Sequence, residues 1–76
     1  MTPKKVIEYH LARLKDKNPD IRLKAIQELE LIGASETLTA LRDVFENDED
    51  SKVRKAAQAA GRTIFLKQQN SGDETG

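Results

Sequence analysis

The stretch "NDEDSKVRKAAQAAG", residues 47–61, decides the fold, because a similar stretch stands earlier in the chain. The earlier stretch is "KNPDIRLKAIQELELIG", residues 17–33. Both pass from an acidic or amide-bearing turn into a segment with helical spacing, and both end in glycine. A displacement of 32 residues superimposes them, so that Asp16 falls on Asp48, Ile21 on Val53, Arg22 on Arg54, Ala25 on Ala57 and Ile32 on Ile64.

The helices that precede these stretches align as well, once one residue of slack is allowed in the loop. Ile7 then matches Leu38, and Leu14 matches Phe45. The repeated unit is therefore a helix, a turn that carries aspartate, and a second helix that opens with Ile-Arg or Val-Arg. Repetition at this period predicts a helical array in which each hairpin buries one face against the next hairpin.

Four helices are predicted from apolar spacing and terminal residues, over about 3–15, 19–32, 36–46 and 51–67. The turns between them are short, so successive helices should pack antiparallel, and no segment alternates with the period of a strand. We expect an all-α fold of two antiparallel helical hairpins stacked as a short α-solenoid. The residues that suit helix ends are Thr2, Asn18, Ser35 and Asp50 or Ser51 as caps, Pro3 and Pro19 as first helical residues, and Gly33 as a stop.

The apolar residues of each predicted helix define the predicted core. Each set recurs at intervals of three or four residues, which places it on one face of a helix. The four sets are Ile7, Leu11 and Leu14 with Val6 beside them; Ile21, Ala25, Leu29 and Ile32; Leu38, Leu41 and Phe45; and Val53, Ala57, Ala60 and Ile64.

The chain has 76 residues and reads as one domain over residues 1–67, with repeats over about 3–33 and 34–67. The remaining segment, residues 68–76, reads "QQNSGDETG" and contains no apolar residue. Such a segment cannot bury enough apolar surface to offset the entropy of ordering it. We therefore expect a disordered polar tail.

Two stretches, "DKNPDIRLKAIQELELIG" and "DEDSKVRKAAQAAGRTI", resemble the second-helix halves of HEAT-like repeats, in the short variety also found in the phycobilin lyase family. The family pattern is Asp-x-x-Pro-x-Val-Arg-x-x-Ala-x-x-x-Leu, and the resemblance covers roughly residues 4–66 of this chain. The second copy departs from the pattern at Ser51, which replaces proline, and at Gly61, which takes the leucine position. The first copy matches it at Asp16, Pro19, Ile21, Arg22, Ala25 and Leu29.

The resemblance implies that the turn aspartate and the following arginine tie neighbouring repeats together, so that Asp16, Arg22, Asp48 and Arg54 form a ladder. The chemistry of these residues agrees, because an aspartate near a helix start accepts backbone N–H bonds and an adjacent guanidinium can pair with it. We expect Arg54 to pair with Asp16, or with Asp48 or Asp50 in its own turn.

The composition excludes several classes of protein. There is no cysteine, so neither a disulfide nor a thiolate metal site can form, and no apolar run is long enough to cross a membrane. The N-terminus lacks an apolar secretory core, which predicts a cytoplasmic protein. The 13 basic residues balance the 13 acidic ones, which argues against general affinity for nucleic acids.

The sequence offers no catalytic or metal-binding constellation. His10 is the only histidine, and we expect it to be partly buried and to serve packing. An EF-hand loop counted from Asp48 would need glycine at its sixth position and glutamate at its twelfth, where the chain has Val53 and Ala59. The glycines do not form a phosphate-binding loop either. We expect no enzyme activity, no metal and no cofactor.

Two surfaces remain as candidate binding sites. The first is the outward side of the second and fourth helices, which either binds a partner or is an ordinary solvated face. Its residues are Lys24, Gln27 and Leu31, and Lys55, Ala59, Arg62 and Leu66. The second is the open end after the fourth helix, where a third repeat would stack, unless Phe65 folds back over its own repeat. Its residues are Ala57, Gln58, Gly61 and Phe65.

These observations predict a small protein-interaction module or adaptor. We expect Lys24, Lys55, Arg62 and Phe65 to contact a protein partner with an acidic surface. Self-association through the open C-terminal end is a further expectation. The alternative, which follows from the lyase-type resemblance, is an accessory subunit of a bilin lyase or light-harvesting assembly. Nucleic-acid binding through the basic fourth helix is the weakest alternative.

Overall fold

The computed structural model describes the backbone of residues 2–73 and the side chains of residues 2–68. The helices are α1 (Lys4–Arg13), α2 (Pro19–Ile32), α3 (Leu38–Asn47) and α4 (Ser51–Asp73), and a 3₁₀ turn, η1 (Ser35–Thr37), precedes α3. No strand occurs in this part of the chain, which confirms the expected all-α fold. None of the described helices is both long enough and apolar enough to span a membrane.

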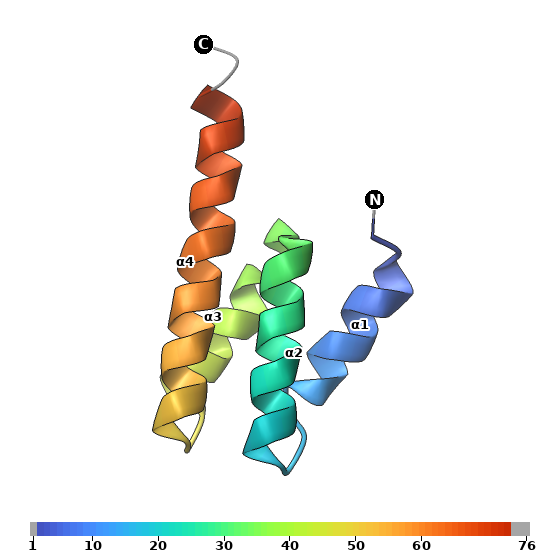
Figure 1. Cartoon of the computed structure of the whole chain (residues 1–76), viewed down its shortest axis with the longest axis vertical. Coiled ribbons are helices and arrows are strands. Elements are labelled where there is room, and N and C mark those ends of the chain that lie inside the picture. The colour runs from blue at the N-terminus through green and yellow to red at the C-terminus, as the bar shows by residue number, and fades with distance from the viewer. Residues whose placement is uncertain (1, 74–76) are drawn as a thin grey trace.

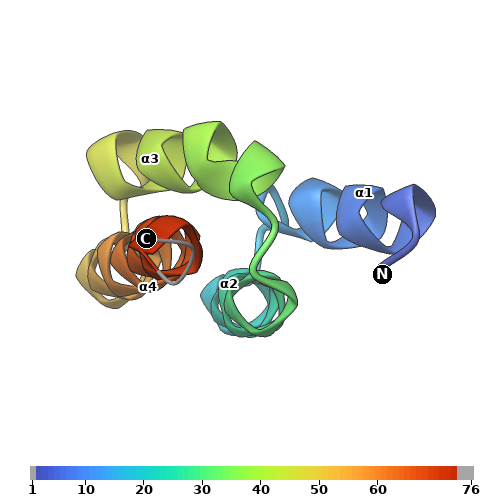
Figure 2. The ribbon, with the colours of Figure 1, turned by 90° about the horizontal axis from the view of Figure 1, so that it is seen from above.

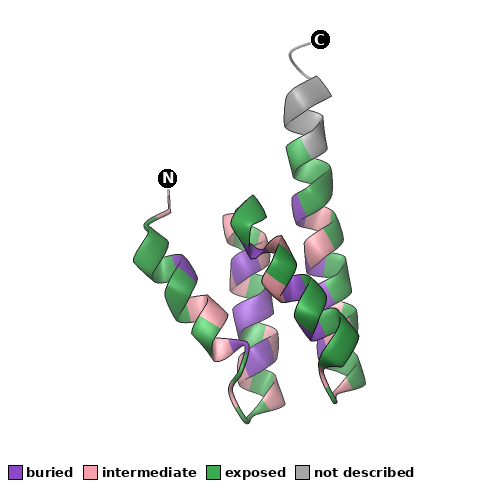
Figure 3. Ribbon diagram, turned by 180° about the vertical axis from the view of Figure 1, so that it is seen from behind, coloured by how far each residue is buried: buried purple, intermediate pink, exposed green. Residues whose placement is uncertain are grey.

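The helices form two layers. Figure 1 shows α2 and α4 side by side and running in the same direction, as the second helices of two successive hairpins. Seen from above, α1 and α3 lie in the other layer and are tilted across α2 and α4, which are viewed nearly end-on (Figure 2). From behind, α3 crosses over both α2 and α4 (Figure 3). This arrangement is the predicted pair of stacked hairpins.

The ends of α2 and the start of α4 follow the sequence prediction. Asn18 Oδ1 accepts the backbone N–H of Asp20 at 2.9 Å, and Pro19 is the first helical residue. Gly33 has a φ of 71°, a left-handed conformation that favours glycine, and it closes α2. Asp50 Oδ1 accepts the backbone N–H of Lys52 at 2.8 Å and so caps α4.

The starts of α1 and α3 differ from the prediction. Pro3 occupies the cap position of α1 in an extended conformation, and no side chain caps that helix, so Thr2 is not its cap. Ser35 begins the 3₁₀ turn rather than an α-helix. The turn is held by Thr37, whose Oγ1 donates to the carbonyl of Ala34 at 2.7 Å, and Thr37 is fully buried. A threonine that satisfies its own hydroxyl can take a core position that apolar spacing does not reveal.

The core lies between the two layers and runs through both hairpins. Figure 3 shows its buried residues on the sides of the helices that face one another. Every inward residue predicted for α4 is buried, as are Ile7 of α1 and Leu14 just after it, while Leu11 is partly buried and Val6 is exposed. The buried apolar residues are Ile7, Leu14, Ala25, Ile26, Leu29, Leu41, Val44, Val53, Ala57, Ala60 and Ile64.

The predicted face of α2 is wrong by part of a turn. Ile21 and Ile32 are only partly buried, whereas Ile26 and Arg22 are buried. With 3.6 residues per turn, the centre of the buried arc is displaced by roughly 55° from the centre of the predicted one. Ala25 and Leu29 are buried as predicted, and the displacement arises because Ile26 is buried while Ile21 and Ile32 lie at the edges of the face. Arg22 escaped the prediction for a different reason, since a residue is assigned to the core by its apolar character and a guanidinium buried by an ion pair does not follow that rule.

The predicted face of α3 is wrong in a related way. Phe45 was assigned to the core, but 39% of it is exposed, and Val44 is buried in its place. Leu38 is only partly buried, while Leu41 is fully buried as predicted. The side of α3 that carries Leu38 and Phe45 faces the end of the array, where no following hairpin covers it.

The fourth helix is longer than predicted. We placed its end near residue 67 and a disordered tail over residues 68–76, but the helix continues to Asp73. At the start of this extension Gln68 Nε2 donates to the carbonyl of Gly33 at 3.4 Å, which links α4 to the end of α2. Residues 74–76 lie outside the described part of the chain.

Candidate docking surface at the end of the second repeat

The two turns that precede α2 and α4 contain the same hydrogen bonds. In the first turn Asp16 Oδ1 accepts the backbone N–H of Asn18 at 2.8 Å. In the second turn Asp48 Oδ1 accepts the backbone N–H of Asp50 at 2.9 Å. The displacement of 32 residues found in the sequence is therefore also a repetition of local geometry.

In the helix that follows each turn, an arginine donates hydrogen bonds to backbone carbonyls of that turn. Arg22 Nη1 donates to the carbonyl of Asp16 at 2.7 Å and to that of Lys17 at 3.1 Å. Arg54 Nη1 makes the equivalent bond to the carbonyl of Asp48 at 2.6 Å. Both guanidinium groups thus satisfy backbone carbonyls that the turn leaves without partners.

Arg22 also joins the two repeats. Its Nε lies 2.9 Å from Asp48 Oδ2, and its Nη2 donates to Asp48 Oδ1 at 3.2 Å. The side chains of the pair are only 10% and 8% exposed, so water screens their attraction weakly. The ladder implied by the family resemblance is present here as one rung, from Arg22 to Asp48.

Of the three partners expected for Arg54, its guanidinium bonds to Asp48, but through the backbone carbonyl, and the expected pairing with a carboxylate of Asp16, Asp48 or Asp50 is wrong. Among the described residues, Arg54 has the carbonyl of Asp48 as its hydrogen-bond partner and no carboxylate. The rung between Arg22 and Asp48 runs forward, from an arginine to the turn of the following repeat. Asp16 lies in the turn of the preceding repeat, so the carboxylate that would match Arg54 belongs to a third repeat.

An open groove of about 320 Å³ lies on the end of the second repeat, between α3 and α4. We call it the end groove. Its walls include Phe45 and Phe65, which are 39% and 51% exposed, so Phe65 does not fold back over its own repeat. The residues that line it are Leu38, Arg42, Phe45, Ala57, Gln58, Gly61, Arg62 and Phe65.

The end groove is the uncovered equivalent of the interface between the two repeats. Positions of the first repeat that the second repeat covers correspond to positions around the groove. The pairs are Ile7 and Leu38, Leu14 and Phe45, Ile26 and Gln58, and Leu29 and Gly61; the first member of each is buried and the second is at least partly exposed. The groove is open because, within the described residues 2–73, no third hairpin lies on it.

The four residues predicted to bind a partner do not lie together. Phe65 lines the end groove, as the sequence suggested for the open end, and Arg62, which was assigned to the outward side of the fourth helix, lines it as well. Lys55 is exposed on α4 but is not among the residues that line this groove. Lys24 lines a different hollow, on the first repeat. Sequence reasoning missed Leu38 and Phe45 as surface residues, because their apolar character placed them in the core.

The opposite end of the array is polar. A hollow of about 240 Å³ there is lined by His10, Arg13, Lys24, Ala25 and Glu28. Its polar side chains stand where the second repeat has the apolar residues Leu41, Val44, Ala56 and Ala60. The first repeat therefore carries on this side a polar surface suited to water, and it acts as a cap.

His10 has the packing role expected from the sequence. It is partly buried, and its ring meets the ring of Tyr9 edge-on at a centroid distance of 5.2 Å. The guanidinium of Arg13 lies 5.3 Å from the centroid of the Tyr9 ring, and its Nη1 donates to the Tyr9 hydroxyl at 2.6 Å. These contacts hold the polar cap together on α1.

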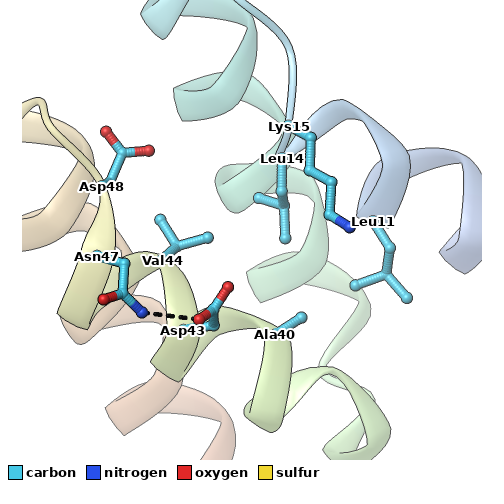
Figure 4. Close-up of a pocket in the computed structure, with 8 residues that line it drawn as sticks. All are labelled: Leu11, Leu14, Lys15, Ala40, Asp43, Val44, Asn47 and Asp48. Atoms are coloured by element: carbon cyan, nitrogen blue, oxygen red, sulfur yellow. Dashed lines mark hydrogen bonds between the residues drawn. The ribbon is translucent and has the colours of Figure 1, made fainter.

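A third hollow, of about 220 Å³, lies at the seam between the end of α1 and α3 (Figure 4). Its acidic groups already have partners, because Asn47 Nδ2 donates to Asp43 Oδ1 at 2.8 Å and Asp48 pairs with Arg22. No group of three or more histidine, cysteine, aspartate or glutamate residues in the described part of the chain could hold a metal ion. We therefore regard the end groove as the candidate site.

The chain matches the family model that describes HEAT repeats, over residues 1–61. This match covers both turns and most of α4. No curated protein and no solved structure matches the chain.

Proposed function

The chain belongs to the HEAT-repeat family, whose members commonly act as protein-interaction modules, and we propose that it is a small protein-binding module or adaptor without catalysis of its own. HEAT repeats are typically not catalytic, which agrees with the absence of any nucleophile and base at motif spacing in the sequence.

One observation carries the proposal, and it is the end groove. Two partly exposed aromatic side chains, Phe45 and Phe65, line it together with Ala57 and Gly61. Burying a phenylalanine that was exposed contributes about 1.5–3 kcal/mol. Because these rings are already about half buried, covering both would contribute about as much as fully burying one, which suits an anchor within an interface.

The charges around the groove favour an acidic partner surface. Arg42 and Arg62 belong to its lining, which contains no carboxylate, although Arg42 also pairs with the neighbouring Glu46 at 3.2 Å. Lys55 adds a cation on the same helix as Arg62. Such exposed cations steer association, whereas the buried aromatic contacts set the rate of dissociation.

The test is to capture partners from cells that express the protein naturally, and to compare wild type with Phe65→Ala. The matched control is Leu31→Ala, because Leu31 is also a large apolar residue, 76% exposed, but on α2. We expect one protein to be captured at a fixed ratio by wild type and Leu31→Ala and lost with Phe65→Ala. Equal capture by all three variants would exclude the end groove as the binding site.

The accessory role in a bilin lyase or light-harvesting assembly rests on the motif resemblance alone and stays a prediction, as does a cytoplasmic location. The family match supports HEAT repeats without the phycobilin-lyase subtype. Bilin absorbance that persisted through purification would favour this alternative over the adaptor.

A further inference from the structure

We propose that the end groove and Arg54 together bind an amphipathic helix of a partner protein, and that an aspartate or glutamate just ahead of that helix pairs with Arg54. This inference rests on the proposed binding function and adds the chemistry of the partner. It follows from comparing the occupied interface between the two repeats with its open equivalent.

Arg54 lies on the same stripe of α4 as the groove. Arg54, Gln58, Gly61 and Phe65 follow one another at intervals of four, three and four residues, which places them on one face of the helix. Arg54 is only partly buried, and Nη1 is the atom that holds the carbonyl of Asp48. In Arg22, Nη1 does the same for its own turn, and Nε and Nη2 reach the carboxylate of the next repeat.

The shape of the groove indicates large apolar side chains on the partner. Between the repeats, α2 buries Ile26 and Leu29 while α4 buries Ala57 and Ala60, so large residues on one helix lie in a layer with small ones on the next. At the open end, the position of α4 equivalent to Leu29 is Gly61, whose side chain is a single hydrogen atom. The large residue of the pair is therefore missing from α4. A Cβ atom added to Gly61 would meet nothing within 4 Å. A partner helix must supply the missing volume.

The spacing between the acidic and apolar residues of the partner also follows from this comparison. In the second repeat, Asp48 pairs with Arg22, and Val53, five residues later, is the first fully buried residue of α4. A partner that repeats this geometry would have an acidic residue, then a turn, then an apolar residue about five positions later, where the helix enters the groove.

A second copy of this chain fits the site poorly. Stacked head to tail, it would bring its Asp16 to the position that matches Arg54, but it would also present the polar cap, with His10, Arg13, Lys24 and Glu28, to a groove that needs apolar side chains. Placed end to end, two copies would bring their own arginines face to face without a carboxylate in the groove lining. The first arrangement sets polar side chains against the apolar groove, and the second leaves arginines without a counter-charge, so both favour a different partner.

The probe for the test is a phage-displayed library of amphipathic helical peptides, randomised in the segment ahead of the helix and on its apolar face. Wild type serves as the bait, and Leu31→Ala is the matched control bait. We expect selected peptides to be enriched in aspartate or glutamate about five residues before a large apolar residue. Gly61→Leu adds a side chain to the groove lining at a position where a Cβ has free space, so it should abolish selection while its circular dichroism spectrum stays that of wild type.

A charge reversal then separates recognition by Arg54 from its role in the turn. The strongest peptide should bind Arg54→Glu about tenfold or more weakly than wild type, because a charge-assisted contact becomes a repulsion. The same peptide with its acidic residue changed to lysine should regain affinity for Arg54→Glu and lose affinity for wild type. A purely structural role of Arg54 would not produce this rescue.

Three results would overturn the inference. The first is a set of selected peptides without acidic enrichment, and the second is peptide binding that survives Gly61→Leu. The third is a wild-type dimer in sedimentation equilibrium that Gly61→Leu abolishes, because the occupant would then be a second copy. If native capture depended on Phe65 while Arg54→Glu had no effect on the captured partner, the proposed function would stand and this inference alone would fail.

Discussion

The rung between Arg22 and Asp48 can be tested by removing its charge and leaving its shape. Asp48→Asn keeps an acceptor oxygen for the backbone N–H of Asp50, which lies 2.9 Å from Oδ1. It leaves the Arg22 guanidinium, whose side chain is 10% exposed, without a counter-charge. Breaking a buried pair from one side costs about 3–5 kcal/mol, and the two carbonyl bonds of Arg22 reduce this, so we expect a loss of about 2–4 kcal/mol.

This loss is large for a chain of 76 residues, whose free energy of unfolding should be roughly 4–11 kcal/mol by the usual value per residue. The melting temperature should fall by about 10–30 °C, since each kcal/mol shifts it by about 4–8 °C in a domain of this size. The assay is urea denaturation followed by circular dichroism, with the free energy of unfolding obtained by linear extrapolation.

The matched control is Asp16→Asn. Asp16 makes the same turn bond, to Asn18 at 2.8 Å, but its carboxylate contacts no arginine, so its change should cost less than about 1 kcal/mol. A double-mutant cycle of Asp48→Asn with Arg22→Met should show a coupling of about 1–3 kcal/mol. Equal losses for Asp16→Asn and Asp48→Asn, or a coupling below about 0.5 kcal/mol, would refute the rung.

Three further predictions concern stability and can be checked by the same urea denaturation. Ile26→Ala should cost about 2–5 kcal/mol, because Ile26 is fully buried, whereas Ile21→Ala should cost about 1 kcal/mol; the reverse order would mean that the face of α2 is wrongly assigned. Gly61→Ala should stabilise α4 by about 0.5–1 kcal/mol, because Gly61 has free space in a helix interior. Gly33→Ala should destabilise the protein by about 1–2 kcal/mol, because Gly33 has a left-handed φ. Lys24→Ala should change the free energy of unfolding by less than about 0.5 kcal/mol, since Lys24 is exposed, and a larger loss would show that the polar cap depends on it.

The candidate site could be predicted only in part. Phe65 was expected at an open end and Arg62 on the outward side of the fourth helix, and both line the end groove. Leu38 and Phe45 were missed, because an apolar residue at helical spacing is ordinarily a core residue. The one available signal was the repeat itself, since these positions match Ile7 and Leu14, which a following repeat covers.

The sequence by itself determined the elements and their repetition. Caps such as Asn18 and stops such as Gly33 act through hydrogen bonds and backbone angles within a few residues, so they can be read without knowing the fold. The alternation of apolar and polar residues on α4 was equally reliable, because that helix buries a narrow face of small residues.

Only the tertiary structure decided which sides of α2 and α3 are buried and where the arginines find their partners. Arg22 is buried because Asp48, 26 residues away in the chain, compensates its charge, and no local pattern reports that distance in space. Phe45 is partly exposed because no described residue of a following hairpin covers the end of the second repeat. Burial is a property of a residue and its neighbours in space, so a repeat predicts equivalent positions but not whether each of them is covered.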